Sequence, residues 1–134
     1  IALHPTYFAR MLSAKIKEAD VKVWLVNTGW SGGAYGTGQR INLNYTRAMI
    51  TAALNGTLDN AEYESDEIFG LTFPKVCPDV PNTILNPRNT WQSKEAYDQK
   101  AHFLASAFLK NFEQFNSYAN EEILSGLPKV LASQ

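Results

Sequence analysis

A cluster of glycines constrains the fold of this chain more than any other feature of its sequence. Five of the eight glycines fall inside ten residues: Gly29, Gly32, Gly33, Gly36 and Gly38. Glycine adopts backbone conformations that other residues reach only with strain, so the cluster predicts a sharply turned loop. Residues 21–27 before it form an apolar, β-branched run typical of a strand buried on both faces. Residues 46–54 after it indicate a largely buried helix, and the order strand, loop, helix predicts an α/β fold.

Apolar spacing predicts the remaining elements. A helix begins at Pro5 and ends near Asp20, because apolar residues recur every four positions between them. Residues 57–80 favour short strands or a hairpin, most clearly at 68–73. Ser93 is a suitable N-cap for a long final helix that reaches Phe115 and packs across the central strand, loop and helix. We expect the residues after Tyr118 to form a tail with at most one extra turn.

Composition limits the class of protein. The chain has 134 residues, of which 45% are hydrophobic, so one domain with a real core is expected. Twelve Lys and Arg against 13 Asp and Glu leave a net charge of −1, without the basic excess that nucleic-acid binding needs. Cys77 is the single cysteine, which suits a reducing cytoplasm. The longest aliphatic or aromatic run, residues 23–26, is too short to cross a membrane.

The glycine loop does not match the two common phosphate-binding motifs. Gly33 and Gly38 have the outer spacing of a P-loop, but Gln39 and Arg40 stand where Lys and Ser or Thr are required. A dinucleotide fingerprint beginning at Gly36 would need its third glycine at Ile41. Backbone N–H groups of such a loop can still hold an anionic ligand. A purely structural surface turn is the alternative.

Arg40 is the side chain that most favours a ligand contact, since it lies between the glycine loop and the following helix. Guanidinium is always charged, and its plane can stack on a base or bond phosphate. Arg47 and Arg88 favour salt bridges or loop bracing, and Thr46 favours capping of the helix. The histidines and acidic residues lack metal-site or triad spacing, so we assign no metal ligand and no catalytic residue.

Four segments, taken in order, resemble the C-terminal part of the ATP-dependent phosphoenolpyruvate carboxykinases. They are Trp24-Leu25-Val26-Asn27-Thr28-Gly29-Trp30, then Gly36-x-Gly38-x-Arg40, then Tyr45-Thr46-Arg47-Ala48-Met49-Ile50 through Asn55-Gly56, and Asn86-Pro87-Arg88-Asn89-Thr90-Trp91. The resemblance runs from about Leu3 to Phe115.

The resemblance implies a fragment of a mononucleotide-binding C-terminal domain. Residues 1–118 would be the C-terminal portion of the nucleotide-binding, catalytic domain, and residues 119–134 a C-terminal tail. By motif position, contact with the adenosine part of ATP falls on Arg40, Ile41 and Thr46. Gln39 departs from the family, since many relatives have lysine there.

The family converts oxaloacetate and ATP to phosphoenolpyruvate, ADP and CO2 in gluconeogenesis, using Mg2+ and Mn2+. Its P-loop, metal ligands and oxaloacetate-binding residues would lie upstream, in a missing N-terminal part of the same polypeptide. We therefore expect this chain alone to be inactive. The alternative is a free-standing, non-catalytic module that binds a ligand or a protein.

Overall fold

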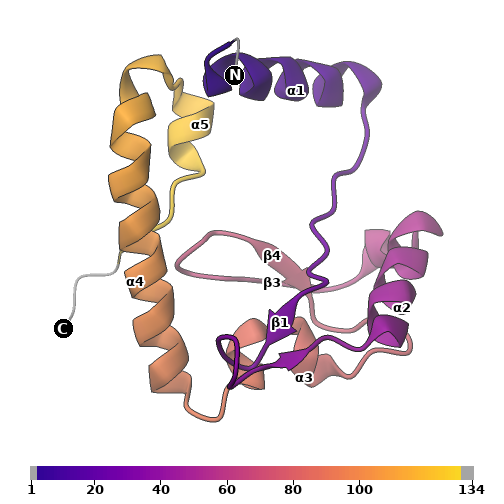
Figure 1. The fold of residues 1–134 in the computed structure, drawn as a ribbon. Coiled ribbons are helices and arrows are strands. Elements are labelled where there is room, and N and C mark those ends of the chain that lie inside the picture. Colours follow the sequence, from indigo (N-terminus) through magenta and orange to yellow (C-terminus); the bar gives the residue numbers. More distant parts are fainter. Residues whose placement is uncertain (1–2, 131–134) are drawn as a thin grey trace.

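The computed structural model describes residues 3–130 as helices and two small sheets joined by long connections (Figure 1). The α-helices of this part are α1 (Pro5–Ala19), α2 (Leu43–Leu54), α3 (Asn82–Leu85), α4 (Lys94–Phe112) and α5 (Glu121–Ser125). The 3-10 helices are η1 (Thr57–Asn60), η2 (Pro87–Thr90) and η3 (Glu113–Tyr118). The strands are β1 (Trp30–Ser31), β2 (Gln39–Arg40), β3 (Tyr63–Ser65) and β4 (Thr72–Pro74).

The predicted first helix is confirmed as α1. Pro5 occupies its first turn, where a missing N–H leaves no hydrogen bond unmade. The imidazole Nδ1 of His4 caps the helix by accepting from the backbone N–H of Thr6 at 3.4 Å. Asp20 ends α1 in the left-handed conformation, with φ of 48°. The rings of Phe115 and Tyr118 pack on His4, so this histidine has a packing role.

The prediction of a buried strand at residues 21–27 is wrong for the described structure. This segment descends from α1 to β1 as an unpaired connection (Figure 1). Leu25 is 82% exposed, while Trp24 is half-buried against a core cluster and Lys22 pairs with Asp59. A strand needs a backbone partner as well as apolar side chains. Residues 3–130 supply no strand that pairs with this segment, so its apolar faces stay largely uncovered.

The glycine cluster forms the turn of an antiparallel hairpin between β1 and β2, which the sequence did not predict. Trp30 is paired with Arg40, and Ser31 with Gln39. Positive φ angles occur at Gly32, Gly33 and Gly36. A Cβ at Gly38 would lie only 2.5 Å from the carbonyl oxygen of Gly33, so the crossing of the chain requires glycine there.

The helix predicted from Thr46 begins three residues earlier, as α2. Asn42 is its N-cap, since its Oδ1 accepts from the backbone N–H of Asn44 at 2.9 Å. The capping role that we expect for Thr46 is therefore wrong, because Thr46 lies inside the helix. The end at Asn55 is confirmed, with Gly56 following in the left-handed conformation.

The hairpin expected within residues 57–80 is formed by β3 and β4, but its turn lies where the apolar run predicts a strand. The carboxylate of Asp66 accepts from the backbone N–H groups of Ile68 and Phe69, at 3.0 and 2.6 Å. Gly70 then takes a φ of 66°. An acidic side chain that bonds the backbone two and three residues on makes a turn, and it overrides the strand propensity of its apolar neighbours.

The long final helix is confirmed as α4, and Ser93 caps it by accepting from the backbone N–H of Ala96 at 3.1 Å. Its buried positions are Ala101 and Ala105. These alanines pack on Ile68. Helix α4 thus lies against the β3–β4 turn, and the expectation that it packs across the glycine loop and α2 is wrong.

The segment expected to be a tail contains α5, which lies beside α1 (Figure 1). The carboxylate of Glu122 pairs with the ammonium of Lys17 at 2.9 Å. Farther along, the backbone N–H of Lys129 donates to the carbonyl of Ile68 at 2.6 Å. The extra turn is therefore present, while the domain boundary at 118/119 stays a prediction.

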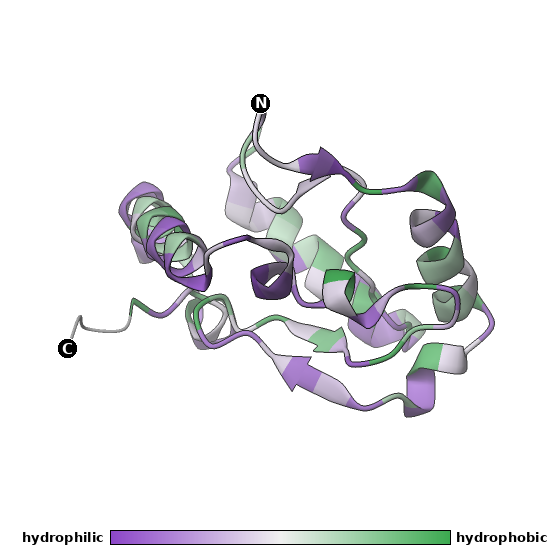
Figure 2. Cartoon of the chain, turned by 90° about the horizontal axis from the view of Figure 1, so that it is seen from below, coloured by the Kyte–Doolittle hydropathy of each residue, from purple (hydrophilic) through white to green (hydrophobic). Residues whose placement is uncertain are grey.

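Two small clusters of buried residues form the core of the described chain. The first joins α2, η1, the loop before α3 and α3 itself through Ala52, Leu58, Cys77, Val80 and Leu85. The second is that of Ile68 with the α4 alanines. Figure 2 shows apolar residues spread over helices and loops rather than gathered at one centre. At the coarse level the structure confirms an α/β chain with small sheets, and much of its apolar surface is exposed.

Candidate functional site

A pocket of about 610 Å³ lies where the glycine hairpin meets the start of α2 and the α3–η2 segment. This volume is within the range of small-molecule sites, ~300–1,000 Å³. Hydroxyl and amide side chains line much of it, together with the guanidinium of Arg40. The lining residues are Ser31, Gly32, Thr37, Gly38, Gln39, Arg40, Ile41, Asn42, Tyr45, Thr83, Ile84, Asn89, Thr90 and Gln92.

Two of the three predicted nucleotide-contacting residues, Arg40 and Ile41, line this pocket. Arg40 is exposed, and its guanidinium makes no ion pair or hydrogen bond within residues 3–130. Ile41 is half-buried, and its backbone N–H donates to the carbonyl of Gly29 at 2.9 Å. The cation is thus held on a paired strand while its charged end stays free to meet an anion.

The third predicted residue, Thr46, does not line the pocket. It lies in the first turns of α2, where its backbone N–H donates to Asn42 at 3.2 Å, and the neighbouring Tyr45 does line the pocket. The Thr46 residue is only 6% exposed. Its hydroxyl makes no hydrogen bond in the described part of the chain. In that part, every side-chain N or O that is fully buried has a hydrogen-bond partner. The hydroxyl oxygen therefore keeps some access to solvent.

The part of the pocket lining that comes from α3 and the following segment was not among the predicted sites. It is formed by Thr83 of α3 and by the amide and hydroxyl side chains of Asn89, Thr90 and Gln92. For Asn89 and Thr90 the signal is the Asn86–Trp91 segment, which the sequence resemblance contains without a role, and Thr83 and Gln92 have no such signal. This segment lies about 50 positions from the glycine hairpin in the sequence. The contact between them could therefore not be predicted from sequence, because only the fold brings them together.

Arg88, on the same segment, makes the salt bridge that the sequence favours for it. Its Nε and one terminal nitrogen donate to the two oxygens of Asp98, both at 2.8 Å. The Arg88 hydrogen bond lowers the pKa of the Asp98 carboxyl, and the pair raises the pKa of Arg88. A bidentate pair of this kind fixes η2 on the first turns of α4. Arg47, in contrast, is exposed and makes no ion pair within the described residues.

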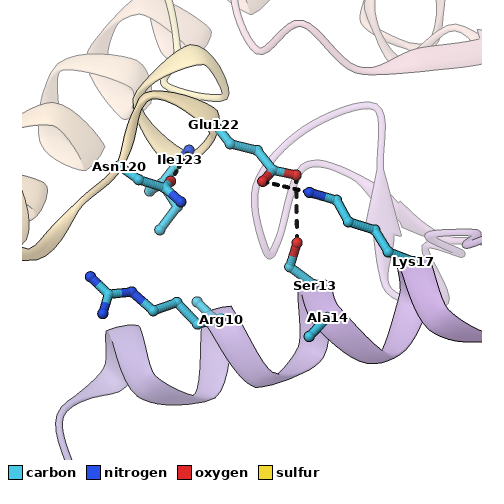
Figure 3. A pocket seen from close by; sticks show the side chains of 8 residues that line it. Arg10, Ser13, Ala14, Lys17, Asn120, Glu122 and Ile123 are labelled. Carbon is cyan, nitrogen blue, oxygen red and sulfur yellow. Dashed lines mark hydrogen bonds and ion pairs between the residues drawn. The ribbon is translucent and has the colours of Figure 1, made fainter.

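A second pocket, of about 420 Å³, lies between α1 and α5 (Figure 3). Glu122 accepts from the ammonium of Lys17 at 2.9 Å and from the hydroxyl of Ser13 at 3.5 Å. Arg10 and Asn120 complete its polar lining. The surrounding side chains are mostly exposed, and the single carboxylate is already paired, so this groove is an interhelical contact rather than a built site.

Other reactive groups do not gather in the described chain. Within residues 3–130 no three His, Cys, Asp or Glu side chains lie close enough to hold a metal ion together. The residues present therefore do not fit the divalent metals that the sequence resemblance implies. Burial raises the pKa of the Cys77 thiol and so favours its unreactive protonated form. None of the described helices is long and apolar enough to span a membrane.

Comparison with known proteins identifies what the chain resembles. A family model described as "Phosphoenolpyruvate carboxykinase" matches residues 1–83. The chain is 64% identical to the phosphoenolpyruvate carboxykinase (ATP) of Flavobacterium johnsoniae over 126 residues, which are 94% of this chain and 24% of that protein. Its identity to the protein of the same name from Christiangramia forsetii is 60% over 126 residues, again 94% and 24%. For Brevibacillus brevis the identity is 56% over 131 residues, 97% and 24%. The chain thus spans about a quarter of the length of these relatives.

Proposed function

The chain belongs to the phosphoenolpyruvate carboxykinase family, and we propose that it forms the adenosine-binding side of the ATP site in an ATP-dependent member. The whole enzyme would convert oxaloacetate and ATP to phosphoenolpyruvate, ADP and CO2, a step of gluconeogenesis. The names of the relatives support the choice of ATP as phosphoryl donor. Family membership favours this function over that of a free-standing binding module.

The observation that carries the proposal is the free guanidinium of Arg40 at the polar pocket. A buried or paired arginine would be explained by structure, but this one is held by β2 and makes no contact with a carboxylate in the described chain. Its plane can stack on a purine or donate to the ribose and phosphate oxygens. Ile41 beside it gives apolar cover for the base.

Thr46 would supply the directional contact. Its hydroxyl can donate to a ring nitrogen or accept from the exocyclic amine of adenine. Tyr45, one residue earlier on α2, would give the aromatic lining. The contact requires the base to approach the first turns of α2 from the pocket side.

These residues would position ATP rather than break bonds. Phosphoryl transfer depends mainly on positioning and on charge stabilisation around the γ-phosphate. In this proposal the phosphate-binding loop, the residues that hold the divalent metals and the oxaloacetate site belong to other parts of the polypeptide. No step assigned to this chain uses a metal. The lone, buried Cys77 agrees with a cytoplasmic location.

The test is steady-state kinetics of a full-length polypeptide that contains this chain. Arg40→Ala and Thr46→Val should each raise the KM for ATP about tenfold, as expected for loss of a hydrogen bond to a ligand. The KM for oxaloacetate should not change. Arg47→Ala is the matched control, because Arg47 is an exposed arginine on α2 outside the pocket lining. Unchanged dependence on ATP in both variants would refute the site.

A further inference from the structure

The η2 turn lies directly against the glycine hairpin, although about 50 residues separate them in sequence. A Cβ built at Gly32 would lie 2.9 Å from the backbone carbonyl oxygen of Thr90, closer than real Cβ atoms approach. The φ of Gly32 is +79°, which L side chains rarely adopt. Two independent features therefore require glycine at this position, and its missing Cβ lets the two backbones touch.

A pair of hydroxyls fixes this contact. The Ser31 hydroxyl donates to Oγ1 of Thr90 at 3.1 Å. Thr90 in turn donates its own proton to the carbonyl oxygen of Pro87 at 2.6 Å. The second bond fixes the orientation of the Thr90 hydroxyl, so a lone pair on the Thr90 oxygen is available to accept the proton of the Ser31 hydroxyl. The Thr90 side chain thus joins β1 to η2, and both partners line the pocket.

The hydroxyl pair sets the place of Arg40. Trp30, the neighbour of Ser31 in β1, is paired across the hairpin with Arg40. The hairpin has only two paired positions, so its own ladder fixes it weakly. On the other side, η2 is held on α4 by the bidentate bond between Arg88 and Asp98. A connected path therefore runs from α4 through η2 and Thr90 to the strand that carries Arg40.

We propose that Thr90 is a positioning residue that sets the hairpin, and with it Arg40, at the correct distance from the nucleotide. This role rests on the proposed function, because it assumes that Arg40 meets ATP. Thr90 acts through Ser31 and the hairpin, and takes no part in the chemical step. Loss of its hydroxyl should leave the reacting groups intact while it loosens one wall of the ATP site.

The experiment compares Thr90→Val with Thr90→Ser in the full-length polypeptide. Valine keeps the shape of threonine but removes both hydrogen bonds, and serine keeps the hydroxyl. Thr90→Val should raise the KM for ATP about three- to tenfold, the range expected for loss of the one hydrogen bond that joins η2 to the hairpin. The values of kcat and of the KM for oxaloacetate should stay within about twofold, and Thr90→Ser should restore the KM for ATP.

Two further variants separate positioning from general stability. Ser31→Ala removes the same bond from the other side, so the double variant with Thr90→Val should raise the KM for ATP no more than Thr90→Val alone. Ser31→Ala also carries the test if Thr90→Val does not fold. Thr57→Val is the matched control, since Thr57 begins another 3-10 helix and its hydroxyl bonds Asn55 at 2.6 Å, outside the pocket. It should not change the KM for ATP.

The outcomes distinguish the two proposals. If Arg40→Ala raises the KM for ATP but Thr90→Val and Ser31→Ala do not, the positioning role is refuted and the ATP site stands. If Arg40→Ala has no effect on the KM for ATP, the positioning role is refuted, and if Thr46→Val has no effect either, the proposed function itself fails. An equal increase in Thr57→Val, or a failure of Thr90→Ser to restore the KM, would mean that the hydroxyl acts through overall stability, which also refutes the positioning role.

Discussion

At the scale of single residues, the structure assigns its arginines very different tasks. The Arg40 guanidinium makes no hydrogen bond or ion pair within the described residues, whereas Arg88 donates two N–H groups to the carboxylate of Asp98. Charge and residue type are the same, so the difference comes from what the fold places beside each side chain. Both side chains of the pair are about two-fifths exposed, so solvent screens the interaction and its contribution to stability is modest.

The Arg88–Asp98 pair should make the stability of the chain dependent on pH in the acid range. The pKa of Asp98 is lowered in the folded state, chiefly by the Arg88 hydrogen bond. A depressed carboxyl pKa stabilises the fold above the unfolded pKa of ~3.9, and this contribution is lost as pH falls through the folded value. Asp98→Asn should therefore lower the urea midpoint at pH 6, and this difference from the unchanged chain should shrink below pH ~4.

Glu64→Gln is the control for this titration. Glu64 is an exposed carboxylate of β3 with no ion pair in the described chain. Its replacement should leave the urea midpoint close to the original at both pH values. A difference between Asp98→Asn and the unchanged chain that grows as the pH falls would contradict the assigned sign.

At the scale of elements, sequence patterns predicted what local interactions decide. Pro5 and Ser93 mark the starts of α1 and α4, and Gly56 follows the end of α2, because caps and stops act within one turn. The prediction of a strand at residues 21–27 was wrong for the opposite reason, since strand pairing depends on segments that are distant in the sequence. The Asp66 turn shows a third case, in which one side chain's bonds to the backbone override the propensity of its neighbours.

The cap of α4 gives a direct test at this scale. The Ser93 hydroxyl accepts from the backbone N–H of Ala96, a donor that would otherwise lack a helical partner. Ser93→Ala should destabilise the chain by ~1 kcal/mol, whereas Ser93→Gly should cost only a few tenths. Amide hydrogen exchange should quicken in the first turn of α4 for the alanine variant alone. Equal effects of both replacements on the urea midpoint would show that the cap is not the cause.

At the scale of the whole molecule, the described chain leaves many of its large apolar side chains exposed. Large apolar side chains such as Phe8, Leu25 and Phe103 are 44–82% exposed, which is unusual for a folded chain with this composition. The relatives are about four times as long, so we expect residues outside this chain to cover these faces. The walls of the pocket likewise come largely from loops and short turns. Its two sides could not be predicted together, since the sequence marks Arg40 and the Asn86–Trp91 segment separately.

The isolated chain should bind ATP differently from a full-length polypeptide, because it spans only about a quarter of its relatives' length. The chain lacks a P-loop motif, and residues 3–130 hold no cluster of side chains able to bind a divalent metal. Adenosine contacts alone leave the triphosphate uncompensated, although its charge contributes much of the binding free energy of nucleotides to proteins. Isothermal titration calorimetry should therefore detect very weak or no ATP binding to these 134 residues, and clear binding to a full-length polypeptide that contains them. Adenosine should lose much less affinity than ATP between the two proteins, because its proposed contacts, Arg40 and Ile41, lie on this chain. Equal ATP affinity in both would mean that the phosphate-binding groups are here after all, and would overturn the division of the site.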